Sequence, residues 1–209
     1  MDRERQTGII AVLRKLAGPL LALAWALFAV VSWMAWRSTG DFVVLLLFCV
    51  NTLFAVLFVS RRNSTAVTDN PKDWMITAAT ILLSFMLRVS ATENVPALMA
   101  SRALQAVGVT IIIISLLSLG RSFGLVPANR GIKTKGLYTY VRHPLYSGEM
   151  LFYLGFAVGN PSLANILLML SIFIGLHLRA GAEERLLQKD NIYTQYLKTV
   201  RFRFFPGLI

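Results

Sequence analysis

The residues best suited to chemistry lie in two polar segments of an otherwise apolar chain. The first, Gly120–Tyr146, contains five cations, three tyrosines and one of the two histidines. The second, Arg179–Ile209, carries two adjacent carboxylates, Glu183 and Glu184. Arginines and backbone N–H groups suit an anion, a carboxylate accepts hydrogen bonds from a sugar diol, and a tyrosine ring stacks on a base. Together the two segments could hold a ligand that combines these three parts.

S-adenosylmethionine and nucleotides both have this combination, and the chemistry alone does not choose between them. The sequence has no Gly-x-Gly-x-x-Gly at a strand-to-helix turn and no phosphate-binding Gly-Lys-Ser loop, so we expect no soluble Rossmann domain. With one cysteine, Cys49, the chain can form no internal disulfide, and with only two histidines it offers no multi-histidine metal site. We therefore expect no metal, and we expect any cofactor to be held by the membrane fold itself.

The elements that position these segments are predicted from the apolar composition. Hydrophobic residues make up 56% of the 209 residues, charged residues make up 15%, and the mean hydropathy is +0.63. A soluble domain is about 45–50% apolar and about 25% charged. Six uncharged or nearly uncharged runs predict membrane helices: Pro19–Trp36, Phe42–Ser60, Trp74–Ala91, Ala103–Leu119, Ser147–Gly159 and Leu163–Leu178. The first run lacks a small-residue cleavage site, which indicates a retained helix rather than a signal peptide.

The last two runs are predicted to form a helical hairpin, because Asn160-Pro161-Ser162 separates them with a turn signal. Ser147–Gly159 has a length of about 20 Å as a helix, which is short for a full crossing. Asn51, inside the second run, is expected to make an interhelical hydrogen bond.

The distribution of cations predicts the orientation in the membrane. Of the 21 lysines and arginines, 18 fall in alternate polar segments on one side, counting Arg3, Arg5, Arg14 and Lys15 at the amino terminus. The positive-inside rule then places both termini in the cytoplasm. The net charge of +11 is explained by this topology and needs no nucleic-acid partner.

The fold class predicted is an all-α integral membrane protein. It has five to six transmembrane helices, of which the last two form a short hairpin, followed by a cytoplasmic carboxyl-terminal helix and tail. We expect residues 1–119 to form the amino-terminal membrane helices and residues 120–209 to form the functional core.

The core resembles a known family over about Gly120–Ile209. The segment Gly136–Gly148 has the pattern Gly-x-Tyr-x-x-x-Arg-His-Pro-x-Tyr-x-Gly, which resembles the signature of the integral-membrane methyltransferases. These include isoprenylcysteine carboxyl methyltransferase and the phospholipid N-methyltransferases. The order of later features also matches, namely a hairpin, then Glu183-Glu184, Tyr193, Tyr196 and Arg203-Phe204-Phe205-Pro206-Gly207.

The resemblance implies transfer of a methyl group from S-adenosylmethionine to a lipophilic or lipid-modified acceptor at the cytoplasmic membrane interface. It implies a cofactor pocket made by Gly136, Leu137, Tyr138, Val141, Arg142, His143, Pro144, Tyr146, Gly148, Glu183 and Glu184. The candidates for acceptor-side, catalytic roles are His143, Glu184, Tyr196 and Arg201. The membrane is the plasma or inner membrane in a bacterium and the endoplasmic reticulum in a eukaryote.

Two other functions remain as alternatives. A membrane reductase of the sterol-reductase kind, which uses NADPH, has a similar tail, but the spacing of glycine and tyrosine before Arg142-His143-Pro144 favours the methyltransferase. A small transporter would need facing polar residues at mid-membrane, and the first four runs offer almost none. The acceptor atom (oxygen, nitrogen or sulfur) and the oligomeric state are left open by the sequence.

Overall fold

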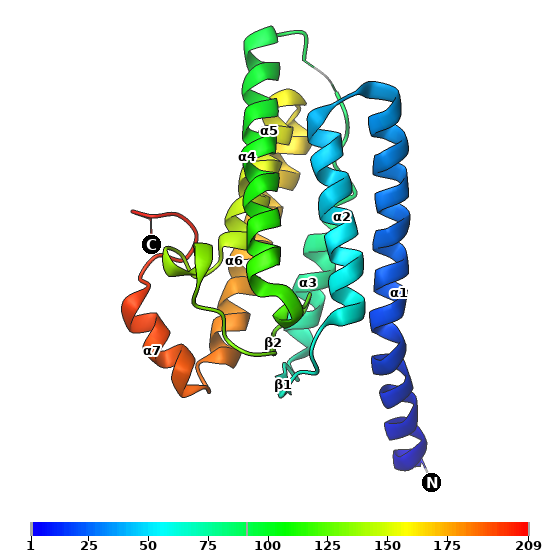
Figure 1. Cartoon of the computed structure of the whole chain (residues 1–209), viewed down its shortest axis with the longest axis vertical. Helices are drawn as coiled ribbons and strands as arrows, with labels where there is room; N and C mark the ends of the chain where they lie inside the picture. The colour runs from blue at the N-terminus through cyan, green and yellow to red at the C-terminus, as the bar shows by residue number, and fades with distance from the viewer. Residues whose placement is uncertain (1, 91, 209) are drawn as a thin grey trace. The chain divides into compact units, whose positions relative to one another are not determined.

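The computed structural model describes the backbone of residues 2–90 and 92–208, and the side chains of residues 18–90 and 92–208. This part of the chain is mostly helical, with one pair of two-residue strands (Figure 1). The helices are α1 (Asp2–Thr39), α2 (Phe42–Ser60), α3 (Pro71–Ser84), α4 (Val95–Leu119), α5 (Pro144–Gly159), α6 (Leu163–Leu187) and α7 (Asn191–Thr199). Two 3₁₀ turns cover Gly120–Ser122 and Gly136–Thr139, and the strands are β1 (Ala66–Val67) and β2 (Ala128–Asn129).

Four helical stretches of the described chain are long and apolar enough to cross a membrane: Gly18–Thr39, Phe42–Ser60, Val95–Ser122 and Leu163–Leu187. The predicted helical, membrane-type class is confirmed at this level. The helices α3 and α5, with 14 and 16 residues, are shorter than a crossing of about 20 residues requires. The basic residues Arg3, Arg5, Arg14 and Lys15, which contributed to the predicted orientation, lie outside the residues whose side chains are described.

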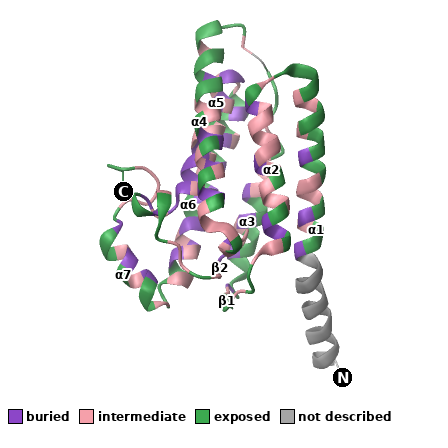
Figure 2. Ribbon diagram, in the orientation of Figure 1, coloured by how far each residue is buried: buried purple, intermediate pink, exposed green. Residues whose placement is uncertain are grey.

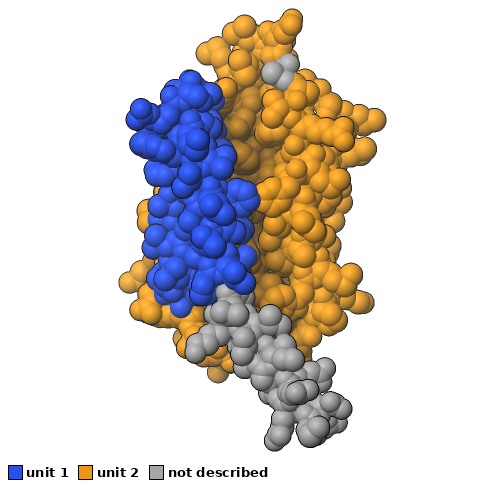
Figure 3. Space-filling view, turned by 90° about the vertical axis from the view of Figure 1, so that its right-hand side faces the viewer, with its two compact units in different colours: residues 1–61 blue, residues 62–209 orange. Residues whose placement is uncertain are grey.

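The chain divides into two compact units, residues 1–61 and residues 62–209 (Figure 3). In the first unit, α1 and α2 are joined by a tight turn in which Gly40 has a φ of 65° and the Asp41 side chain accepts from the Val43 N–H at 2.9 Å. The Asn51 amide donates to the Ser32 hydroxyl at 3.0 Å, so the interhelical hydrogen bond predicted for Asn51 is confirmed. Figure 2 shows exposed and half-buried residues along most of both helices, as expected for apolar helices whose solvent is lipid.

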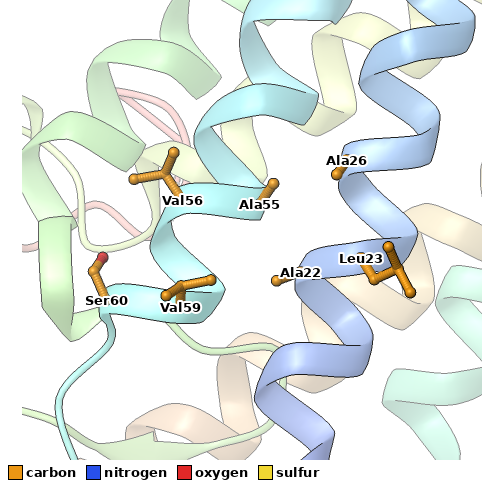
Figure 4. A pocket seen from close by; sticks show the side chains of 7 residues that line it. All are labelled: Ala22, Leu23, Ala26, Ala55, Val56, Val59 and Ser60. Carbon is orange, nitrogen blue, oxygen red and sulfur yellow. The ribbon is translucent and has the colours of Figure 1, made fainter.

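Small side chains leave a shallow groove of about 520 Å³ between α1 and α2 (Figure 4). Its lining residues are Ala22, Leu23, Ala26, Ala55, Val56, Val59 and Ser60. Apart from the Ser60 hydroxyl, this lining has no polar side chain. The groove therefore offers no group for acid–base chemistry.

In the second unit, α5 lies closely against α4 because glycines face the partner backbone. A Cβ built on Gly148 would come 2.7 Å from the Gly108 carbonyl oxygen, and one on Gly155 would come 2.8 Å from that of Ser101. Real Cβ atoms do not approach backbone oxygens this closely, so only glycine fits at these positions. Small residues at such crossings allow membrane helices to approach each other, and this contact fixes the start of α5.

The third apolar run is helical over a shorter range than predicted. We expected a helix over Trp74–Ala91, but α3 ends at Ser84, and Ala91 itself lies outside the described residues. The non-helical backbone that follows is satisfied by α6, since the Asn165 side chain accepts from the Arg88 N–H at 3.0 Å and donates to the Arg88 carbonyl at 2.8 Å. An irregular backbone among membrane helices requires such partners, and a run of apolar residues does not reveal them.

The predicted hairpin is present as α5 and α6, which are joined at residues 160–162. Ser162 begins α6 as its N-cap, accepting from the Asn165 N–H at 3.1 Å. At the opposite end of α6, Arg185 donates to Asp73 at 3.1 Å, which ties α6 to the first turn of α3. The polar loops meet at that same end, because β1 pairs with β2 in an antiparallel register.

Candidate active site

His143 and Pro144 mark the point where the polar loop becomes α5. Pro144 is the first residue of the helix, where a missing N–H costs no helical hydrogen bond. One turn later, the Ser147 hydroxyl donates to the His143 carbonyl at 3.1 Å, which closes the first turn. The His143 ring is buried, 6% exposed, so it is held at the helix start with little freedom to move.

The Glu184 carboxylate is surrounded by the side chains of two arginines and a histidine. Its Oε1 lies 3.1 Å from His143 Nε2, 3.2 Å from Arg142 Nη1 and 3.1 Å from Arg203 Nε. Its Oε2 accepts from Arg203 Nη2 at 2.5 Å, so the Arg203 contact is bidentate. Glu184 is 4% exposed, and a buried carboxylate is stable only with partners of this kind. The sequence-predicted residues Arg142, His143 and Glu184 are thus brought into direct contact.

Glu183 faces the same histidine from the other side of the ring. Its Oε1 accepts a short hydrogen bond from the Tyr146 hydroxyl, and its Oε2 lies 3.7 Å from His143 Nδ1. The His143 and Tyr146 rings are parallel within 4° at a centroid distance of 5.5 Å. The buried Arg179 guanidinium lies 5.0 Å from the Tyr146 ring centroid, a cation–π contact. Each ring nitrogen of His143 therefore faces a carboxylate.

The carboxyl-terminal tail crosses the start of α5 and is bound to it through the backbone. The Arg142 and His143 N–H groups donate to the carbonyls of Phe202 and Arg203, both at 2.9 Å. These bonds place the Arg203 side chain over the pair Glu183–Glu184. The tail therefore contributes a side chain, Arg203, to the site.

This crossing also changes the environment of the tail's aromatic rings. Charge and ring alternate over residues 201–205, and the partly buried rings of Phe204 and Phe205 pack against an apolar cluster. The buried residues of that cluster are Tyr146, Met150, Ile172, Leu176 and Ala180. Alternation along a segment does not show which surface the segment meets.

Of the two arginines in the tail, Arg203 contacts the Glu184 carboxylate. The Arg201 side chain, a predicted site residue, is exposed, and its carbonyl accepts from Arg142 Nη2 at 2.9 Å. Arg203, part of the terminal motif, binds Glu184 and also contacts His177 Nε2 at 3.3 Å. The two arginines lie two residues apart, so alternation puts both on one side, and only the tertiary contact distinguishes them.

The predicted tyrosines support the loop. The Tyr196 hydroxyl donates to the Tyr138 carbonyl at 2.6 Å and lies 3.4 Å from that of Val141. Burial raises the pKa of Tyr138 and of Tyr196 above the usual value, so both hydroxyls stay protonated at neutral pH. Tyr196 therefore donates a hydrogen bond to the loop.

The remaining predicted pocket positions shape the backbone. Gly136 has a φ of 67°, which favours glycine, and begins the 3₁₀ turn that contains Leu137 and Tyr138. Pro144 and Val141 are buried beside His143, and Gly148 lies at the contact with α4. These residues set the path of the loop, whereas the polar contacts come from Arg142, His143, Glu183 and Glu184.

Two buried polar atoms near Glu184 have no hydrogen-bond partner among the described residues. They are Arg142 Nε and the hydroxyl of Tyr193, which is 4% exposed. Glu184 and Arg142 both act electrostatically on the Tyr193 hydroxyl. Such orphaned groups are rare in folded proteins and often mark a place for a ligand. Both an acceptor and a donor for a bound molecule are therefore available beside the carboxylate pair.

Comparison with known proteins agrees with this geometry. Residues 96–195 match the phospholipid methyltransferase family. The match begins in α4, includes the loop and the hairpin, and ends within α7, so it contains Arg142, His143, Glu183 and Glu184. The expected resemblance is confirmed over this range, and it indicates a membrane methyltransferase rather than a reductase or a transporter.

One solved structure is similar at a lower level. It is a eukaryotic intramembrane Ras methyltransferase, an isoprenylcysteine carboxyl methyltransferase, with 18% sequence identity and a TM-score of 0.45. The alignment covers 79% of this chain and 68% of that one. No curated protein matches the sequence.

Proposed function

We propose that this protein transfers the methyl group of S-adenosylmethionine to a lipophilic or amphiphilic acceptor at the cytoplasmic interface of a membrane, and that residues 120–209 are its catalytic core. The observation that carries the proposal is the buried Glu184, in contact with Arg142, His143 and Arg203 inside the family match. Buried clusters of ionisable side chains are typical of functional sites.

The residues present fit the proposed donor. Arg142 and the backbone N–H groups of the loop suit the donor's carboxylate. The carboxylates Glu183 and Glu184 suit its ribose hydroxyls and its positive sulfonium, and the rings of Tyr146 and Tyr193 add polarisable faces. When bound, the sulfonium supplies an activated methyl group. The unpartnered Tyr193 hydroxyl and Arg142 Nε would find partners in such a molecule.

The contribution of the chain to the reaction is mainly positioning. Holding donor and acceptor in line can supply about 7–11 kcal/mol of the barrier. His143 is fixed between two carboxylates, and Glu184 is fixed by two arginines and that histidine, so the site needs little reorganisation when the reactants enter. The apolar faces of the helices supply a dry approach for an acceptor from the bilayer.

The test is calorimetric titration of the purified protein in detergent with S-adenosylhomocysteine and with NADPH. We expect S-adenosylhomocysteine to bind and NADPH not to bind. The Glu184→Gln variant keeps the side-chain volume but leaves Arg142 and Arg203 without their counter-ion, so its affinity should fall at least about tenfold, or about 1.4 kcal/mol. Glu93→Gln, at an exposed position, is the matched control and should bind normally.

Binding of NADPH alone would contradict the proposal and favour a reductase. Unchanged S-adenosylhomocysteine affinity in Glu184→Gln would contradict the assignment of the site.

A further inference from the structure

His177 is the second histidine of the chain, and the proposed function has not used it. It lies in α6, seven residues or about two turns before Glu184. Its side chain is exposed and continues a stripe with Leu170 and Ile174, which are 47% and 61% exposed. An ionisable group at the end of an apolar helix face is costly and is a candidate for function.

The contact between His177 and Arg203 decides which ring nitrogen carries the proton. Arg203 Nη1 lies 3.3 Å from His177 Nε2. A guanidinium has only N–H donors and keeps its charge in proteins. His177 Nε2 must therefore be the acceptor, so the imidazole is neutral and its proton is on Nδ1. A doubly protonated ring would place two donors and two positive charges against each other.

With this contact, all three nitrogens of the Arg203 guanidinium have a partner. Nε and Nη2 donate to the two oxygens of Glu184 at 3.1 and 2.5 Å, and Nη1 donates to His177. The guanidinium is planar, so partners at two of its edges leave its plane one orientation. Glu184 alone would hold only one edge.

The next residue of the tail contacts the same histidine. The Phe204 ring centroid lies 6.0 Å from the His177 ring centroid and 6.0 Å from that of His143, with interplanar angles of 53° and 45°. The Phe204 carbonyl accepts from the Ser147 hydroxyl at 2.5 Å. His177 therefore contacts two successive residues of the tail at the place where the tail is bound to the start of α5.

We propose that His177 is a positioning residue, which accepts a hydrogen bond from Arg203 Nη1 and thereby holds the guanidinium in the orientation that pairs with Glu184. Because Glu184 belongs to the proposed donor pocket, loss of this hydrogen bond weakens donor binding. That consequence rests on the proposed methyltransferase function, whereas the hydrogen bond does not. His177 acts through Arg203, so its effect requires that arginine.

Nitrogen-15 NMR of the histidine-labelled protein tests the hydrogen bond directly. The protein is purified without a histidine tag and measured in detergent micelles at pH 8. The chain has two histidines, so the spectrum of His177→Gln assigns both. We expect the proton of His177 on Nδ1 in the wild type, and a shift of the tautomer toward Nε2–H in Arg203→Ala. A proton on Nε2 in the wild type would overturn the inference.

Titration with S-adenosylhomocysteine measures the effect on the site. Methionine and glutamine are similar in size, but only glutamine offers a strong acceptor. The affinity should fall about fivefold in His177→Met, as for the loss of one hydrogen bond, and His177→Gln should restore most of it. Leu178→Met, at the next exposed position, is the matched control and should bind normally.

A double-mutant cycle distinguishes positioning from a purely structural role. In an Arg203→Ala background, His177→Met should cause no further loss, because the residue through which it acts is gone. The cycle is followed by titration and by thermal unfolding, so it can be read even where binding is weak. Losses that are equal with and without Arg203, or equal in His177→Met and His177→Gln, would overturn the inference but leave the methyltransferase proposal intact.

The two proposals can fail separately. If the wild-type protein shows the expected tautomer but does not bind S-adenosylhomocysteine, the proposed function is wrong and the contact between His177 and Arg203 stands. If it binds S-adenosylhomocysteine with unchanged affinity in His177→Met, the positioning role is wrong.

Discussion

At the scale of residues, the site depends on one buried carboxylate and on which cations reach it. Glu184 is adjacent to Glu183 in sequence, and both contact His143, yet their other partners differ, since Glu184 meets two arginines and Glu183 meets a tyrosine. The residue types were visible in the sequence. Their pairing was not, because it depends on how the tail crosses the hairpin.

Replacement of each tail arginine by alanine tests the pairing of Glu184 with Arg203. Arg203→Ala removes the bidentate contact with Glu184, so the free energy of unfolding should fall by about 1–3 kcal/mol. Arg201→Ala, two residues away and exposed, should change it by less than about 0.5 kcal/mol. Denaturation in detergent micelles measures both values. An equal loss in the two variants would show that the tail does not bind as described.

The buried tyrosines of α7 predict a dependence of stability on alkaline pH. Burial raises the pKa of Tyr193 and of Tyr196, so the unfolded chain ionises first, near pH 10. Their contribution to stability is complete below that pH and is lost as the pH rises toward the folded-state values.

Replacement of Tyr193 and of Tyr196 by phenylalanine shows how much each hydroxyl contributes to stability. Tyr196→Phe loses a 2.6 Å hydrogen bond and should cost about 1 kcal/mol at pH 8. Tyr193→Phe removes a buried hydroxyl that has no partner among the described residues, so it should leave stability equal or higher and should weaken the decline above pH 10. Unfolding curves at pH 8 and pH 11 check both expectations. A loss of more than about 1 kcal/mol in Tyr193→Phe would reveal a hydrogen bond to that hydroxyl.

At the scale of elements, the position of His143 is determined by a helix contact remote from the chemistry. Gly148 lies against α4 one to two turns after His143, with no space for a Cβ. The sequence showed Gly148 as part of a motif, but its place at a helix crossing came only from the packing of α4 against α5.

A Gly148→Ala substitution, which adds one methyl group, tests the contact between α4 and α5. Gly148→Ala should force α5 away from α4, lower the free energy of unfolding by about 1–3 kcal/mol, and weaken S-adenosylhomocysteine binding because His143 moves. Gly181→Ala is the matched control in α6, since its Cβ would meet only Arg185 Nη1 at 3.6 Å, and it should be neutral or stabilising by up to about 1 kcal/mol. Thermal unfolding and titration are the measurements. Normal binding by Gly148→Ala would separate the α4 contact from the site.

For the whole molecule, the distribution of cations predicts that the loop before α4, which contains Glu93, and the carboxyl-terminal tail lie on opposite sides of the membrane. In a Cys49→Ser background, Glu93→Cys should react with a membrane-impermeant maleimide in sealed right-side-out vesicles. Lys198→Cys in α7 should react only after permeabilisation, because the positive-inside rule places it in the cytoplasm. Both positions are exposed in the structure. The reverse pattern of labelling would invert the topology.

Properties that depend on composition and local order could be predicted from the residues alone. Apolar runs and a proline-containing turn were enough to predict α1, α2, α4 and the hairpin, because a helix among lipids must be apolar over most of its length. The polar residues of Gly136–Gly148 and the pair Glu183-Glu184 marked the candidate site. Ionisable groups are costly inside a membrane, so those that flank membrane helices are candidates for function.

Only the tertiary structure decided the properties that depend on contacts between distant segments. The early end of α3 relies on the Asn165 side chain, 77 residues from Arg88. The choice of Arg203 over Arg201 relies on backbone pairing between the tail and the start of α5, and the contact of the Arg179 guanidinium with the Tyr146 ring relies on the hairpin. The physical reason is common to all three, since a polar group is satisfied by whichever partner the fold brings near, and local sequence does not specify that partner.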